Sequence, residues 1–381
     1  MADSTSGPLR GIRVLELAGI GPGPYAAMVL ADLGADVLRV ERPGQARDVA
    51  EPVILRGRRR TVLDLKKAAD REAFLALCER ADVLIEPYRP GVAERLGVGP
   101  DVCGQRNPRL VYARMTGWGQ DGPWAQAAGH DITYIAVTGA LHGIGRAGGP
   151  PQPPINLLGD FAGGSLFLVI GVLAALLERE TSGQGDVIDA AIVDGTAHLT
   201  TYVLGQLARG LWNEKRGGNR LDTGQPNYDV YATADDRWMA VGALEPQFYA
   251  ELLRVLGIDA AALPAPNDPA GLAEVRAALS ARFAERTRDE WTAAFAGTDA
   301  CVSPVLTWNE APANPQLAAR GTLVERAGVW QPAPAPRFTR SPLDLPDAPP
   351  AAPEDARGVL SDWRRAAATG ASSLSVSEQR T

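Results

Sequence analysis

The stretch that decides the fold is residues 14–41, VLELAGIGPGPYAAMVLADLGADVLRVE. Residues 14–17 and 36–40 are short apolar runs typical of buried strands, and residues 25–33 have the composition of an apolar helix that Gly34 ends. Two strands joined through a helix run parallel, because the chain must cross back to the same end of the sheet. The stretch therefore predicts a strand–helix–strand unit of a parallel sheet.

The same alternation continues to about residue 120. Further strands are expected over 61–65, 82–85 and 110–115, with a helix over 71–80. This order predicts an α/β fold, in which ligands bind at the carboxyl ends of the parallel strands. A long helix from about Asp160, and then a strand and a helix within 186–205, extend the same domain.

A glycine-rich polar stretch over 216–224 interrupts this pattern and is typical of a linker. We expect a large domain over 1–215, a linker over 216–227 and a smaller α+β domain over 228–329. From residue 330 the chain is rich in proline and is expected to run extended over the surface. The tail over 366–381 is expected to be disordered.

The composition of the chain argues against several classes of protein. Its 381 residues are 45% hydrophobic, and the most apolar run, residues 166–177, is too short to span a bilayer. We therefore expect a buried helix there and no membrane association. A net charge of −7 argues against bulk binding to nucleic acid. The start of the chain lacks the pattern of a secretory signal, and three widely spaced cysteines fit a cytoplasmic protein without a metal site.

The loop over residues 19–24, GIGPGP, partly matches the glycine-rich fingerprint of dinucleotide-binding proteins. Pro24 stands where the fingerprint has its third glycine. Pro22 and Pro24 also lack the backbone N–H groups that would hold a pyrophosphate. We therefore interpret the loop as a tight strand-to-helix turn, and a dehydrogenase stays a distant alternative.

Nine short motifs are spread over nearly the whole chain, up to about residue 363. They are GIGPGPYAAM (19–28), LGADV (33–37), ERP (41–43), YRPGV (88–92), RMTGWGQ (114–120), GHDI (129–132), NLLGDF (156–161), DAA (189–191) and GALEPQFY (242–249). Together they resemble the family III CoA-transferase superfamily, and most closely its α-methylacyl-CoA racemase branch. The resemblance implies a Rossmann-like large domain, to which residues 330–365 return, and a small domain. It also implies an interlocked homodimer, with each active site between the large domain of one chain and the small domain of the other.

His130 and Asp160 are the predicted catalytic acid/base pair. Racemising a 2-methylacyl thioester requires a proton to leave one face of the α carbon and another to arrive on the opposite face, so two groups must flank that carbon. A histidine suits this work because its ordinary pKa is about 6.5, although a lone histidine more often only caps a loop. Asp160 begins an apolar helix, where aspartate also serves as an N-cap. In the resemblance both are catalytic, and neither metal nor cofactor is needed.

Other site residues follow from the resemblance and from charge. The small residues Gly163 and Gly164 are expected to let the enolate oxygen approach the N-terminus of the helix. Glu245, supplied by the partner chain, is expected to pair with the histidine. Four arginines are expected to bind the coenzyme A phosphates: Arg39, Arg42, Arg58 and Arg89. Tyr228, an aromatic residue of the small domain, is expected to contact the acyl part. His142 and His198 have no motif around them and are interpreted as structural.

Two other functions remain open from the sequence. A family III CoA-transferase would use Asp160 as a nucleophile that forms an acyl anhydride. The GHD segment (129–131) and the GALEPQ segment (242–247) favour the racemase, because transferases need no such histidine and commonly have a Gly-Asn-Asp-like segment at the second position. A thioester-binding protein without catalysis is the third possibility, and intact His130, Asp160 and Glu245 argue against it.

Overall fold

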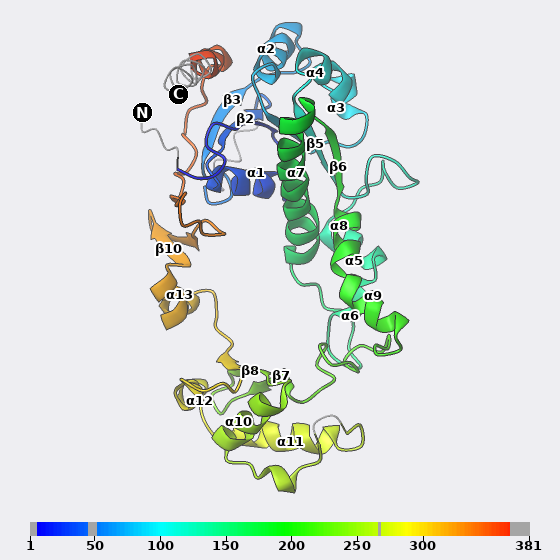
Figure 1. Ribbon diagram of the computed structural model, residues 1–381, viewed down its shortest axis with the longest axis vertical. Helices are drawn as coiled ribbons and strands as arrows, with labels where there is room; N and C mark the ends of the chain where they lie inside the picture. The colour runs from blue at the N-terminus through cyan, green and yellow to red at the C-terminus, as the bar shows by residue number, and fades with distance from the viewer. Residues whose placement is uncertain (1–5, 45–51, 266–267, 366–381) are drawn as a thin grey trace, which may run out of the picture. The chain divides into compact units, whose positions relative to one another are not determined.

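The computed structural model describes residues 6–44, 52–265 and 268–365. The chain forms two compact units. The first contains the chain up to Thr138, the segment Ile155–Leu199 and the chain from Gln331 onward, and the second contains Gly139–Pro154 and Thr200–Trp330. Each unit is described by itself below (Figure 1).

The first unit is built on a six-stranded sheet in which every strand pair is parallel. Its strands are β1 (Arg13–Leu17), β2 (Asp36–Glu41), β3 (Arg58–Val62), β4 (Val83–Glu86), β5 (Val111–Thr116) and β6 (Val187–Ala191), in the spatial order β3-β2-β1-β4-β5-β6. This confirms the predicted α/β fold with a Rossmann-like sheet. Strand order reverses between β1 and β4, and such a reversal is where doubly wound sheets open a crevice for ligands.

Helices cover both faces of this sheet because successive strand residues point to opposite sides. They are α1 (Pro22–Asp32), α2 (Ala68–Cys78), α3 (Val92–Arg95), α4 (Pro100–Arg106), α5 (Asp131–Val137), the π-helical segment η2 (Leu157–Leu166), α7 (Phe167–Ser182) and α8 (Ile192–Leu199). Leu15 and Leu84 pack with Phe74 of α2 in one core. Val14 and Ile85 belong to the opposite core, with apolar residues of α1 and α7.

Buried ion pairs replace apolar contacts along one side of β1, β2 and β3. Glu16 on β1 is fully buried and pairs with Arg39 Nη1 at 2.5 Å and with Arg58 Nε at 3.1 Å. Arg60 forms two hydrogen bonds of 2.8 Å to Glu41. The third strand was expected over 61–65, but it spans Arg58–Val62 because carboxylates neutralise the arginines that alternate into the interior.

The helix that was expected to begin near Asp160 extends well beyond its most apolar run, residues 166–177. Segments η2 and α7 form one helical run, Leu157–Ser182, of 26 residues with a mean hydropathy of 2.1. By length and composition this run could cross a membrane, so the apolar run is longer than expected, and the absence of membrane association stays a prediction. A core helix of a soluble protein meets the same criterion, and Leu168 and Val172 of α7 are fully buried against the sheet.

The second unit contains a three-stranded antiparallel sheet of β7 (Tyr228–Ala232), β8 (Trp238–Gly242) and β9 (Val302–Pro304). Its helices are α6 (Ala140–Gly143), α9 (Thr201–Ala208), α10 (Pro246–Leu256), η3 (Ala260–Ala262), α11 (Leu272–Phe283), α12 (Arg288–Phe295), η4 (Ala311–Ala313) and α13 (Pro315–Arg320). The strands β10 (Leu323–Arg326) and β11 (Val329–Pro332) pair with each other. Trp291 and Phe283 pack with Tyr231 in the hydrophobic core of the second unit.

The boundaries of this unit differ from the expected ones. Residues 139–154 belong to it, as does the chain from Thr200. Arg216 explains this, because its side chain donates hydrogen bonds to the carbonyl oxygens of His142 at 2.8 Å and Gly149 at 2.7 Å. The expected linker is itself folded, since Asp222 accepts hydrogen bonds from Gly217 N and Asn219 N.

The C-terminal part of the described chain packs on the first unit. Glu354 lies beside the outer strand β3, where its backbone N–H donates a hydrogen bond of 2.7 Å to the carbonyl oxygen of Arg60. Residues 356–365 are helical rather than extended, and Trp363 is only 2% exposed in the core beside α2. The predicted disordered tail, residues 366–381, lies outside the described residues.

Candidate active site

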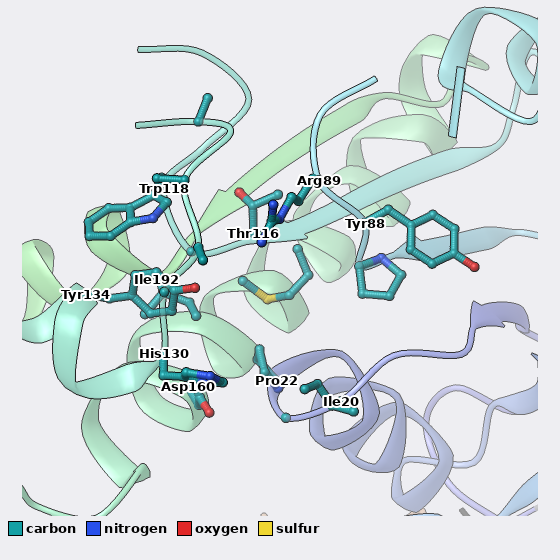
Figure 2. Close-up of a pocket in the computed structure, with 18 of the residues that line it drawn as sticks. Ile20, Pro22, Tyr88, Arg89, Thr116, Trp118, His130, Tyr134, Asp160 and Ile192 are labelled. Atoms are coloured by element: carbon teal, nitrogen blue, oxygen red, sulfur yellow. The ribbon is translucent and has the colours of Figure 1, made fainter. Parts of the chain in front are cut away.

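A cavity of about 220 Å³ opens at the carboxyl ends of β1, β4 and β5, next to the reversal in strand order. Loops that follow these strands form much of its wall, and α5, η2 and α8 also contribute lining residues (Figure 2). The lining residues used below are Gly21, Arg89, Trp118, His130, Tyr134 and Asp160. The parallel sheet therefore places the two predicted catalytic residues in one cavity at the expected edge.

His130 is the residue immediately before α5. Its backbone is extended (φ −137°, ψ 169°) and not helical. The residue is exposed and lines the cavity. Thr133 fixes this conformation: its Oγ1 accepts a hydrogen bond from His130 N at 3.0 Å and donates one to His130 O at 2.7 Å. The imidazole is therefore presented to the cavity on a backbone that is held at both its N–H and its carbonyl group.

Asp160 lies in the first turn of η2, and Figure 2 shows its carboxyl beside His130. Its side chain is half-buried, and burial is the main cause that raises the pKa of this carboxyl. The negative charge of Asp131 raises the pKa further, while a hydrogen bond from Asn156 and the charge of His130 lower it. A carboxyl with a raised pKa can carry a proton closer to neutral pH than an ordinary aspartate can.

The glycine loop after β1 comes close to Asp160. A Cβ atom on Gly21 would lie 3.2 Å from Asp160 Oδ2, and the φ of Gly21 is +66°, a conformation that other residues rarely adopt. The loop is thus a wall of the cavity, and Pro22 begins α1. This agrees with its interpretation as a tight turn.

Aromatic residues form another wall, which the sequence analysis did not identify. Tyr134 packs edge-on against Trp118, with ring centroids 4.8 Å apart. Cβ atoms on Gly117 and Gly129 would lie 2.1 Å and 2.4 Å from the Tyr134 ring, so both positions require glycine. The signal in the sequence was weak, because a tyrosine four residues after a histidine is usually only a core residue.

Glu86 and Arg114 form an ion pair near the ends of β4 and β5, next to the two lining loops that follow these strands. They are partners in the register of β4 and β5, and Glu86 Oε2 lies 3.2 Å from Arg114 Nε. Glu86 Oε1 also accepts a hydrogen bond from Tyr88 N at 2.6 Å, which fixes the start of the loop that carries Arg89. Burial is the main cause that raises the pKa of Glu86 from 4.5 to about 7.

Glu86→Gln is expected to change how stability depends on pH. The folded-state pKa of Glu86 lies above its ordinary value, so its ionisation costs the native state free energy as pH rises from about 4.5 to 7. Glutamine cannot ionise, so the variant does not lose this free energy. The free energy of unfolding of the variant minus that of the wild type should therefore increase by about 3 kcal/mol over this range. Guanidinium unfolding between pH 4.5 and 8 measures the difference. A difference that stays constant with pH would contradict this assignment.

A family model described as CoA-transferase family III matches residues 9–356 of the chain. The chain belongs to CoA-transferase family III. Alpha-methylacyl-CoA racemase of Mus musculus is 47% identical over 335 residues, which cover 88% of this chain and 87% of the relative. The Homo sapiens protein of the same name is 46% identical over 336 residues, with the same coverage. A solved CAIB/BAIF family protein from Brucella suis superposes with a TM-score of 0.80 at 27% identity, covering 94% of this chain and 100% of that one.

Two of the arginines that were expected to bind coenzyme A lie inside this family III protein. All three side-chain nitrogens of Arg58 donate hydrogen bonds within the protein, to Glu16 and to the carbonyl oxygens of Arg56 and Pro24. Arg39 is 1% exposed and donates to Glu16 and, at 3.3 Å, to Gly19 O. This gives no support to the expected role of either arginine: they bind the two ends of the glycine loop and do not line the cavity.

The other two arginines, Arg42 and Arg89, are exposed. Arg89 is exposed and lines the cavity, and its charge acts on the hydroxyl of Tyr134. Arg42 is exposed just after β2, where its charge acts on Tyr88. Their exposure at the carboxyl edge of the sheet fits the predicted role in phosphate binding.

Gly163 and Gly164 do not line this cavity. A Cβ atom on Gly163 would lie 2.5 Å from Thr196 Oγ1, and one on Gly164 would lie 3.0 Å from Ile192 Cγ1. The helical run begins at Leu157 rather than at Asp160, so both glycines lie inside it and face α8 instead of a free helix N-terminus. The geometry gives no support to the expected oxyanion role, and their small size serves close helix packing.

Glu245 and Tyr228 lie in the second unit. Glu245 is exposed and immediately precedes α10. Tyr228 on β7 lines a separate cavity of about 380 Å³ with Cys301. The pairing of Glu245 with His130 and the contact of Tyr228 with an acyl group therefore stay predictions. His142, in the same unit, forms a 2.9 Å hydrogen bond between Nε2 and Glu214 O.

Proposed function

We propose that this family III protein is an isomerase that interconverts (2R)- and (2S)-2-methylacyl-CoA thioesters. The observation that carries the proposal is the shared cavity of His130 and Asp160, in a chain 46–47% identical to two α-methylacyl-CoA racemases. Two proton carriers of different chemistry at one small site are what a 1,1-proton transfer needs.

The reaction follows from these two side chains. One of them, in its basic form, removes the α proton, and the electron pair of the C–H bond moves onto the thioester oxygen to give an enolate. The other, in its acidic form, delivers a proton to the opposite face as the carbonyl group re-forms. The roles of His130 and Asp160 exchange in the reverse direction, and no metal or cofactor takes part in the proposed reaction.

The raised pKa of Asp160 fits a residue that takes and gives a proton. A transferase needs Asp160 as an ionised nucleophile, whereas a racemase needs an aspartate that can also hold a proton. Burial and the neighbouring Asp131 both favour the protonated form. The surroundings of Asp160 are therefore compatible with proton transfer, and the similarity to two racemases decides between the reactions.

Coenzyme A is proposed to bind with its phosphate groups near Arg89 and Arg42. Both residues are exposed, and Arg89 borders the cavity in which the thioester is proposed to sit. Arginine recognises phosphate through paired, charge-assisted hydrogen bonds. The cavity of about 220 Å³ suits the reacting end of the substrate, so the nucleotide end is proposed to lie along the protein surface.

A homodimer in the cytoplasm is the proposed assembly. On α7, Ile170, Leu173 and Leu177 are 59%, 37% and 76% exposed, and their spacing puts them on one face of the helix. An apolar face of this kind is typical of an interface. A second copy of the chain would cover it, and would also supply Glu245 to orient His130.

Ile170→Glu with Leu177→Glu is expected to convert the dimer to a monomer, because two carboxylates would be desolvated at the interface. Analytical ultracentrifugation of the wild type and the variant measures the change. Val102→Glu is a matched control, since Val102 is 38% exposed on α4, outside the α7 face. A wild-type protein that sediments as a monomer, or a double variant that stays dimeric, would contradict the proposed interface.

Exchange of the α proton tests the function directly. Purified protein is incubated with (2R)-2-methylacyl-CoA in deuterated water, with and without a free carboxylic acid, while deuterium content, configuration and CoA transfer are followed. Deuterium uptake with convergence to both enantiomers would support the racemase. Transfer of CoA to the added acid without deuterium uptake would make the protein a transferase instead.

A further inference from the structure

Asp131 is a buried carboxylate next to the site that the reaction above does not use. It is the first residue of α5, directly after His130, and it is 6% exposed. Its Oδ2 accepts a hydrogen bond of 2.7 Å from the backbone N–H of Asp160. Its Oδ1 is buried and has no hydrogen-bond partner among the described residues. A buried carboxylate with one oxygen unsatisfied is costly, so its presence requires a reason.

The protein makes room for this contact at Gly159. A Cβ atom there would lie 2.5 Å from Asp131 Oδ2 and 2.8 Å from its Cγ, distances that no real side chain tolerates. Gly159 is buried and precedes the residue whose N–H is bound. Glycine at 159 and aspartate at 131 therefore form one unit that holds the backbone of Asp160 against α5.

The charges around Asp160 come from few elements. From α5 and the residue before it come Asp131, His130 and the hydroxyl of Tyr134, and from the start of η2 comes the amide of Asn156. His130 and Asn156 favour the ionised form of Asp160, and Asp131 opposes both. Oδ1 of Asp131 accepts no hydrogen bond from the described residues.

A racemase that uses one histidine and one aspartate faces a problem of proton balance. In the working state the pair holds a single proton, which must be on either partner for the two directions of reaction. The ordinary pKa values of histidine and aspartic acid differ by about 2.6, so a shared proton would favour the histidine by about 400 to 1. A negative charge beside the aspartate reduces this bias.

We propose that Asp131 is a positioning residue for proton transfer: its carboxylate holds Asp160 at the cavity, and its negative charge makes Asp160 able to keep a proton. The role of Asp160 as an acid rests on the proposed function. The contact and its effect on the Asp160 carboxyl do not, and they can be measured on the free protein.

Asp131→Asn separates the charge from the contact. Asparagine keeps an oxygen that can accept the Asp160 N–H, but it removes the negative charge. The protein is labelled with ¹³C at the aspartate carboxyl groups, and the Asp160 signal is assigned by its loss in Asp160→Asn. In Asp131→Asn the Asp160 carboxyl is expected to titrate at lower pH than in the wild type. The acidic limb of the pH profile of deuterium uptake is expected to move in the same direction.

Two further variants keep this test decisive. Gly159→Ala pushes the Asp131 carboxylate away without removing its charge, so it should also lower the pH at which Asp160 titrates. Asp101→Asn, at an exposed position on α4, should leave that titration unchanged. An Asp160 carboxyl that titrates at the same pH in the wild type and in Asp131→Asn would overturn the proposal. A wild type without deuterium uptake would refute the racemase function and leave the carboxyl titration to decide the role of Asp131.

Discussion

His130→Ala is expected to lower the rate of racemisation by 10²- to 10⁴-fold, roughly the contribution of one acid/base group, while exchange of the α proton persists in one enantiomer. Inversion needs a group on each face of the α carbon, so the loss of either stops it in both directions. Asp160 can still remove the proton from the face that it meets and return a deuteron from solvent to that face. Asp160→Asn should give the mirror result, with exchange only in the other enantiomer.

The measurement follows deuterium content and configuration separately, starting from each pure enantiomer. His142→Ala is the matched control, because His142 lies in the second unit and bonds to Glu214 O. Its rate of inversion should equal that of the wild type. Two variants that both exchange the same enantiomer would show that His130 and Asp160 do not serve opposite faces.

Glu16→Ala is expected to lower the free energy of unfolding by about 3–5 kcal/mol, the usual cost of leaving a buried charge without its partner. Burial lowers the pKa of Arg58, and the charge of Glu16 and its hydrogen bond to Arg58 oppose that effect. Without Glu16, the guanidinium of Arg58 keeps only hydrogen bonds to carbonyl oxygens. The same change releases Arg39 from the pair that holds it near the glycine loop.

Chemical denaturation of the wild type and the variants measures this loss. Glu16→Gln keeps one acceptor oxygen and should give an intermediate value. Glu251→Ala is the control, because it breaks a 2.7 Å ion pair with Arg254, which is 64% exposed, and exposed pairs contribute about 0–1 kcal/mol. Equal losses for Glu16→Ala and Glu251→Ala would mean that the buried pair contributes no more than a surface one.

The parallel sheet could be predicted because its signal is local. The apolar runs of β1 and β2 flank a helix within one stretch of 28 residues, residues 14–41, and that connection admits only parallel pairing. The position of β3 could not be predicted in the same way. Arg58 and Arg60 resemble surface residues until Glu16 and Glu41, from other strands, are known to lie beside them.

The two proposed proton carriers, His130 and Asp160, were predicted from motifs that resemble a known family, and the structure places both at one cavity. What surrounds them could not be predicted in this way. The contact between Asp131 and the N–H of Asp160 joins two segments of chain 29 residues apart. The expected role of Gly163 assumed that the helix starts at Asp160. The helix starts at Leu157, so Gly163 lies inside it, where it packs against α8.

The order in which the chain is synthesised matters for the first unit. Its outer strand β3 is completed only by residues near the end of the chain: Gly57 N donates to Asp347 O, Arg59 pairs with Glu354 and Asp362, and Trp363 enters the core. These residues must therefore be synthesised before the contacts at the outer edge of β3 can form. Until then the outer edge of β3 lacks these contacts, and an uncovered edge strand is a place where another chain can pair.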